Sequence, residues 1–133
     1  MNKLFLLGGL AAACLIAAPA APALAKQASP IATLDKDNDG TVDLNEINKS
    51  AEALFVVLET DSDGTLDQKE VGKHISKKDF AAADPDKSGT LSKDEYLVYV
   101  TGLFKEADPD NDGTLDEKEI KSKKGKALLR ATQ

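Results

Sequence analysis

The chain has 133 residues, of which 23 are acidic and 17 are Lys or Arg, and its formal net charge is −6. This acidic balance argues against nucleic acid and anionic membranes as partners, because both would repel the protein. The sequence has no His, Cys or Ser constellation with a plausible base, so we do not expect an enzyme. The surplus of carboxylates favours cations as ligands.

The N-terminus has the pattern of an export signal. Lys3 gives a short positive segment, residues 4–18 are apolar, and Ala-Leu-Ala at 23–25 is a small-x-small cleavage site. We therefore predict a signal peptide over 1–25 with cleavage after Ala25. The mature protein would then be periplasmic or secreted.

Cleavage would leave one domain, residues 26–133, without stable membrane contact. It would also remove the only cysteine, Cys14, so disulfides would be unavailable and bound metal would be the usual substitute in a small domain. Two alternatives remain open. An uncleaved anchor is one, although the apolar stretch is shorter than the roughly 20 residues that a span needs; lipidation of Cys14 is the other.

A fourfold repeat of 24 or 25 residues organises the rest of the chain. Each copy contains a 12-residue segment with acidic or polar residues at positions 1, 3, 5 and 9. Gly stands at position 6, Thr at 7, an apolar residue at 8 and Glu at 12. We call these segments loops 1 to 4; they are residues 35–46, 59–70, 84–95 and 108–119.

The spacing resembles that of EF-hand loops, in which six to eight oxygens surround a Ca²⁺ ion. Clusters of Asp and Asn also form ordinary turns, but four copies in register, each closed by Glu, favour the metal loop. The predicted ligands stand at positions 1, 3, 5, 7, 9 and 12. They are Asp35, Asp37, Asp39, Thr41, Asp43 and Glu46; Glu59, Asp61, Asp63, Thr65, Asp67 and Glu70; Asp84, Asp86, Ser88, Thr90, Ser92 and Glu95; and Asp108, Asp110, Asp112, Thr114, Asp116 and Glu119.

These ligand positions use 18 of the 23 acidic residues, five each in loops 1, 2 and 4 and three in loop 3. Loop 3 carries Ser88 and Ser92 where the other loops have carboxylates, so we expect it to be the weakest site. Loop 2 opens with Glu59, which is one methylene longer than Asp and could coordinate less tightly.

Only 12 or 13 residues separate successive loops, over 47–58, 71–83 and 96–107. The first and third gaps have room for one helix of about 15 residues, roughly 22 Å long, shared by both neighbouring loops. Apolar residues at steps of three and four support these helices. They are Leu44, Ile47, Ala51, Leu54, Phe55 and Leu58 in the first gap, and Tyr96, Tyr99, Val100, Leu103, Phe104 and Ala107 in the third.

The middle gap predicts two short helices with a break near residues 74–76, because Gly72 comes early and Ser76 with Asp79 resembles an N-cap. His74, the only histidine, is expected to be a solvated surface residue. Residues 128 and 129 are expected to pack a final short helix on the core. The predicted fold class is all-α: a compact EF-hand fold with four loops joined by short shared helices packed as a small bundle.

The signal peptide, the four loops, the short gaps and the Asp-Pro-Asp openings of loops 3 and 4 together resemble the lanmodulin family of bacterial periplasmic lanthanide-binding proteins. Pro85 and Pro109 match the family's proline at position 2, whereas Lys36 and Thr60 depart from it. Its position-9 acid is matched in every loop except loop 3, where Ser92 stands. The resemblance implies trivalent lanthanides as ligands beside Ca²⁺.

Charge supports a trivalent ion independently, because attraction to the carboxylates scales with ion charge at fixed distance. The five carboxylates of a loop carry five negative charges, which leaves an excess of three with a divalent ion and of only two with a trivalent ion. Counting charge alone, loop 1 should discriminate between ions as well as loop 4 does, despite Lys36.

We therefore predict a monomeric metal carrier or buffer that binds up to four Ca²⁺ or lanthanide ions. The alternative is a calcium-dependent sensor that binds an unidentified protein partner when it is loaded with metal. Sensors commonly use Met-rich surfaces, and the only methionine is Met1, which favours the carrier.

Overall fold

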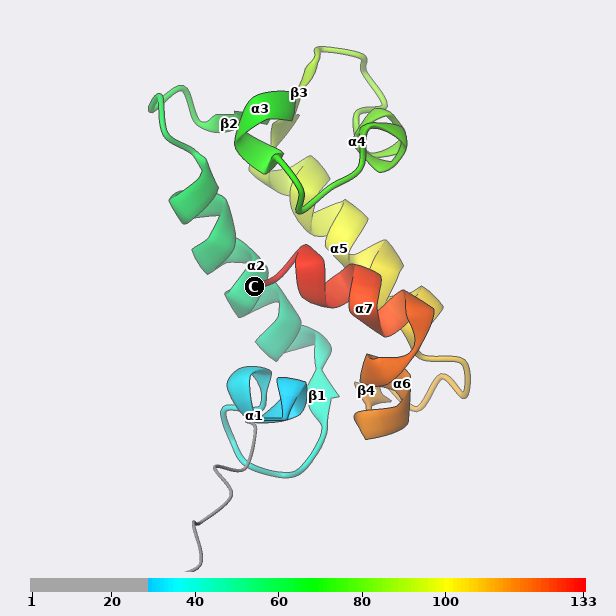
Figure 1. Ribbon diagram of the computed structural model, residues 1–133. Helices are drawn as coiled ribbons and strands as arrows, with labels where there is room; N and C mark the ends of the chain where they lie inside the picture. The colour runs from blue at the N-terminus through cyan, green and yellow to red at the C-terminus, as the bar shows by residue number, and fades with distance from the viewer. Residues whose placement is uncertain (1–28) are drawn as a thin grey trace, which may run out of the picture.

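The computed structural model describes residues 29–133, so the predicted signal peptide and Cys14 lie outside the described residues. Helices dominate this range (Figure 1). The helices are α1 (Pro30–Leu34), α2 (Leu44–Leu58), α3 (Gln68–Val71), α4 (Lys77–Ala83), α5 (Lys93–Ala107), α6 (Glu117–Lys121) and α7 (Lys123–Arg130). The strands are β1 (Val42–Asp43), β2 (Thr65–Asp67), β3 (Thr90–Ser92) and β4 (Thr114–Leu115).

The helices α2 and α5 confirm the prediction of shared helices in the first and third gaps. Each has 15 residues and joins two loops without a break. The two helices pack against each other, and α7 lies across α5 near the middle of the molecule (Figure 1). Because one helix serves two loops, the loops are spaced by helix length.

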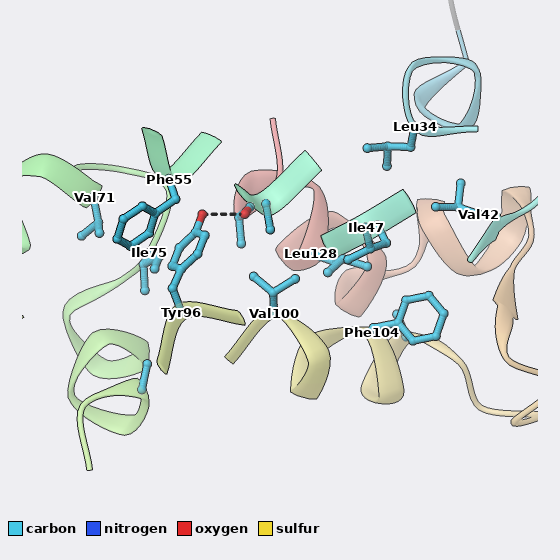
Figure 2. Close-up of a cluster of buried hydrophobic side chains, with 14 of the residues drawn as sticks. Leu34, Val42, Ile47, Phe55, Val71, Ile75, Tyr96, Val100, Phe104 and Leu128 are labelled. Atoms are coloured by element: carbon cyan, nitrogen blue, oxygen red, sulfur yellow. Dashed lines mark hydrogen bonds between the residues drawn. The ribbon is translucent and has the colours of Figure 1, made fainter. Parts of the chain in front are cut away.

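The core lies along the facing sides of α2 and α5 (Figure 2). The rings of Phe55 and Tyr96 have centroids 5.7 Å apart at an interplanar angle of 60°, a tilted arrangement that aromatic pairs prefer. The Tyr96 hydroxyl donates a hydrogen bond of 2.7 Å to the carbonyl of Ala131, drawn as the dashed line in Figure 2. Leu128 is fully buried, which confirms that the last helix packs on the core.

Two antiparallel strand pairs bring the loops together in twos. β1 pairs with β4, placing Val42 opposite Leu115, and β2 pairs with β3, placing Leu66 opposite Leu91. All four side chains stand at position 8 and are 0% exposed. Loops 1 and 4 therefore share one end of the molecule and loops 2 and 3 the other (Figure 1). The all-α prediction omitted these strands, which are too short to show an alternating pattern.

Two short helices, α3 and α4, lie on either side of a break in the middle gap, as predicted, although α3 begins within the last three positions of loop 2. The break spans Gly72, at φ 49°, to Ser76. The Ser76 hydroxyl accepts from the Asp79 N–H at 3.2 Å and donates to the Asp79 carboxylate at 2.7 Å. The expectation for His74 needs correction: it is half-buried, and its Nδ1 lies 2.8 Å from the carbonyl of Arg130. The end of α7 covers it.

Candidate metal centres

Each acidic loop is fixed between two helix ends. The residue at position 1 follows a helix and donates its N–H to a carbonyl of that helix, as Asp35 does to Ile31 at 2.8 Å. The residue at position 9 is the N-cap of the next helix; these residues are Asp43, Asp67, Ser92 and Asp116. The structure thus places the predicted position-9 ligands as helix caps.

The glycine at position 6 makes the sharp turn of each loop. An added Cβ would meet nothing within 4 Å at any of the four glycines, so backbone conformation rather than space requires glycine there. The φ values are 92° at Gly40, 83° at Gly64, 87° at Gly89 and 87° at Gly113. This turn directs the backbone N–H groups toward the side chain at position 1.

The carboxylate at position 1 accepts the N–H of that glycine. The distances are 3.0 Å to Asp35, 2.9 Å to Asp84 and 3.1 Å to Asp108. Glu59 makes the same bond at 3.3 Å. The longer side chain in loop 2 therefore preserves the loop conformation, and its effect falls on the position of its oxygens.

Three carboxylates converge in each loop, with oxygen atoms that all lie within 4.8 Å of one another. Loops 1 and 2 bring together positions 1, 3 and 5, whereas loops 3 and 4 bring together positions 1, 3 and 12. The groups are Asp35, Asp37 and Asp39; Glu59, Asp61 and Asp63; Asp84, Asp86 and Glu95; and Asp108, Asp110 and Glu119. Glu46, Glu70 and Asp112 lie outside these groups.

Position 7 is hydrogen-bonded to position 5 in all four loops, and loops 1, 2 and 4 share one pattern. In loop 1, both the N–H and the hydroxyl of Thr41 donate to Asp39 at 2.8 Å, and the matching pairs in loops 2 and 4 have the same distances. In loop 3, Ser88 Oγ likewise accepts the Thr90 N–H, at 3.3 Å, but its hydroxyl donates to the Thr90 carbonyl at 2.9 Å. That carbonyl is a predicted ligand, and the Ser88 hydroxyl occupies one of its two lone pairs. The ranking of loop 3 as the weakest site stays a prediction.

The closing Glu at position 12 completes a capping box in every loop. Its Oε2 accepts the N–H of position 9, as Glu119 does from Asp116 at 2.9 Å. In loops 1 and 2 its Oε1 accepts the N–H of position 2, which belongs to Lys36 or Thr60. These two donors carry no sequence signal, because a backbone N–H occurs at every residue except proline.

In loop 4, the pKa values of two carboxyl groups are raised, in part by repulsion between neighbouring carboxylates. Burial raises the pKa of Glu119, and the charges of Asp110, Asp116 and Asp108 add to this effect. The Asp112 N–H lowers the pKa of Asp110, but burial and the neighbouring charges outweigh it, so the net shift is upward. Carboxylates that repel one another in this way are stabilised by a cation placed between them.

The environment of one carboxylate oxygen, Asp108 Oδ1, shows whether the residues of loop 4 suit a metal ion. Asp108 is 5% exposed, and its buried Oδ1 has no hydrogen-bond partner among residues 29–133. A buried carboxylate oxygen without a donor is costly, and Asp108 belongs to the converging group with Asp110 and Glu119. The oxygen-only donor set suits hard cations such as Ca²⁺, so the residues fit the ion.

Within the described range, no helix is both long and apolar enough to cross a membrane. Two segments match known sequence families: residues 78–98 match an EF hand and residues 100–122 match an EF-hand domain pair. These segments contain all of loops 3 and 4. A search of curated proteins found no match. The two matches and the acidic groups together support an EF-hand protein that binds metal ions, with calcium as the ion the family implies.

Proposed function

We propose that this EF-hand protein is an exported carrier or buffer of hard metal ions. It binds up to four Ca²⁺ or trivalent lanthanide ions, and binding is coupled to folding. The observation that carries the proposal is the set of four converging carboxylate groups, with a buried Asp108 oxygen that no donor within residues 29–133 satisfies. The lysines offset only part of the carboxylate charge, because the chain keeps a net charge of −6.

The preference for trivalent ions rests on charge and on resemblance. Loops 1, 2 and 4 each offer five acidic side chains at ligand positions, an excess that +3 offsets better than +2. Pro85, Pro109 and the position-9 acids add the resemblance to lanmodulin. When bound, the ion would supply positive charge that offsets the repulsion between these carboxylates.

Export rests on the N-terminal pattern of Lys3, an apolar stretch and the Ala-Leu-Ala site at 23–25. Expression of the full chain in a bacterial host, followed by N-terminal sequencing of the periplasmic fraction, tests it. We expect the mature chain to begin at Lys26. A protein that stays in the cytoplasm with Met1 intact would refute export.

A luminescent terbium titration in millimolar Ca²⁺ tests the ion preference. We expect terbium to remain bound, and we expect Asp43→Ser and Asp116→Ser to lower its affinity at loops 1 and 4. Asp94→Ser, which removes an exposed acid at position 11, is the matched control. Complete displacement of terbium by Ca²⁺ at equal concentrations would leave an ordinary calcium buffer.

A groove between α4 and α5 favours the second candidate, a metal-dependent interaction module. Its volume is about 660 Å³, and Val98 on its wall is 72% exposed. Glu95, the closing residue of loop 3, also lines it, so metal and partner would be coupled. Acidic lining residues outnumber the one lysine, Lys124, which pairs with Glu106. A cationic amphipathic peptide is therefore the probe, and binding that requires Ca²⁺ would support this candidate.

A further inference from the structure

The closing Glu has two different environments in the four loops. Its Oε2 accepts the position-9 N–H in all of them, at 3.2 Å in loop 1, 3.0 Å in loop 2, 2.8 Å in loop 3 and 2.9 Å in loop 4. The environments diverge at Oε1. In loop 1 it accepts the N–H of Lys36 at 2.5 Å, and in loop 2 it accepts the N–H of Thr60 at 2.8 Å.

In loops 3 and 4, Oε1 of the closing Glu has no hydrogen-bond donor among the described residues. The reason is covalent: position 2 is Pro85 or Pro109, and proline has no backbone N–H. Glu95 and Glu119 lie instead within the converging acidic groups of their loops. Glu46 and Glu70, held by position 2, do not.

We propose that the N–H at position 2 is a latch that holds the closing Glu away from the metal position in loops 1 and 2, and that Pro85 and Pro109 leave it free in loops 3 and 4. Position 2 is therefore a positioning residue that acts through position 12. The inference rests on the proposed function, because it concerns how the same loops take up metal. It assigns the prolines a role that does not depend on the identity of the ion.

The electrostatics of two closing residues, Glu70 in loop 2 and Glu119 in loop 4, agree with this division. The Thr60 N–H is the main cause that lowers the pKa of Glu70, with a further contribution from the Asp67 N–H. Glu119 has the opposite shift, for which burial and three neighbouring carboxylates are responsible. A latched Glu has donors at both carboxylate oxygens, whereas, within residues 29–133, an unlatched one has donors at Oε2 alone.

Loops 1 and 4 provide the cleanest comparison. Both have the same five acids at the same positions, and they pair through β1 and β4. Charge counting alone predicts equal affinity. The latch predicts that loop 4 binds first, because loop 1 must break a charge-assisted hydrogen bond before Glu46 can reach the ion. A bond of this kind corresponds to a difference on the order of tenfold or more in affinity.

Position 2 can be exchanged between the two loops without altering the backbone before it. A residue that precedes proline must be extended. Asp35, at φ −64° and ψ 97°, meets this requirement, and the residue before Pro109, Asp108, has φ −103° and ψ 83°. Lys36→Pro removes the latch from loop 1, and Pro109→Ala installs one in loop 4. Lys36→Ala keeps the N–H and removes the charge together with the hydrogen bond of 2.6 Å from Lys36 Nζ to the Thr33 carbonyl.

The test is a Ca²⁺ titration of residues 26–133 followed by ¹H–¹⁵N NMR. The position-6 amides of Gly40 and Gly113 report loops 1 and 4 separately. In the unaltered chain we expect Gly113 to respond at lower Ca²⁺ than Gly40. The resonance of the Lys36 amide proton should move upfield as that of Gly40 responds, because the Glu46 carboxylate, which accepts the Lys36 N–H, moves to the ion.

Pro109→Ala should lower the Ca²⁺ affinity of loop 4 about tenfold, so that Gly113 no longer responds at lower Ca²⁺ than Gly40. Lys36→Pro should strengthen loop 1 by a similar factor, and Lys36→Ala should change it less than threefold. The proposal is overturned if Pro109→Ala shifts loop 4 by less than twofold, or if Gly40 responds while the Lys36 amide does not move. If no loop responds to Ca²⁺ or to La³⁺, the proposed metal function fails instead. Because Pro109→Ala is conservative, misfolding of Lys36→Pro would not decide the result.

Discussion

The hydroxyl of Tyr96 joins the helix that leaves loop 3 to the C-terminal end of the chain. Tyr96 is fully buried, and its hydroxyl donates to the Ala131 carbonyl at 2.7 Å. Tyr96→Phe keeps the ring against Phe55 and removes only this donor. The packing contribution is retained, so the loss should stay well below the roughly 3–5 kcal/mol that truncating a buried aromatic ring to Ala costs.

The expected loss follows from the state of the carbonyl that remains. A buried hydrogen bond contributes a net 0.5–1.5 kcal/mol or so, and a buried partner left without a donor costs roughly 1–3 kcal/mol. The Ala131 residue is 0% exposed, so water cannot readily replace the phenol. We therefore expect Tyr96→Phe to lower the unfolding free energy by about 2 kcal/mol. For a domain of this size that corresponds to a Tm lower by roughly 8–16 °C.

Thermal unfolding of the Ca²⁺-loaded protein, monitored by far-UV circular dichroism, measures the loss. Tyr99→Phe is the matched control: this side chain is half-buried on the same helix, and its hydroxyl has no hydrogen-bond partner within residues 29–133. We expect the control to change the unfolding free energy by less than about 0.5 kcal/mol. Equal losses in the two variants would show that the Tyr96 hydrogen bond does not stabilise the fold.

Three further predictions concern metal, pairing and pH. Chelation at neutral pH should reduce the helical circular dichroism signal, because carboxylates crowded in empty loops repel and metal binding supplies folding free energy; an unchanged signal would contradict coupled folding. Leu115→Ala should cost about 2–5 kcal/mol and weaken loops 1 and 4 together, since Leu115 packs opposite Val42. Loss at loop 4 alone, seen in the glycine amide shifts, would refute that coupling. Burial raises the pKa of Tyr96 above its ordinary range and that of Tyr99 to about 12. Both phenols hold their protons more tightly when folded, so stability is complete below pH 10 and falls from pH 10 toward 12; equal urea midpoints at pH 8 and 11 would disprove this.

Sequence alone predicted the loops and the shared helices because both have local causes. A metal loop needs fixed spacing within 12 residues, and an amphipathic helix repeats its apolar residues every three or four positions. The 12-residue gap after loop 1 left room for one helix only, and α2 spans Leu44–Leu58 as that argument required. The repeat also shows an apolar residue at position 8 of every loop, and all four of these residues are buried.

The remaining features depend on contacts between distant residues. Val42 meets Leu115 across 73 positions of sequence, and no local pattern specifies that partner. His74 looked solvated because the end of α7, which supplies its hydrogen-bond acceptor, is 56 residues away. The position-2 latch was missed for another reason. Its donor is a backbone N–H, and the sequence gives only an indirect sign of that group, through the two prolines that do not have one.

The central claim is that residues 26–133 bind four ions through the four loops. Native mass spectrometry of the mature chain with increasing Ca²⁺, and separately with La³⁺, counts the bound ions directly. We predict four, falling to three in each of the single variants Glu46→Gln, Glu70→Gln, Glu95→Gln and Glu119→Gln at limiting metal. A count of two that survives Glu46→Gln and Glu70→Gln would restrict binding to loops 3 and 4 and contradict the claim.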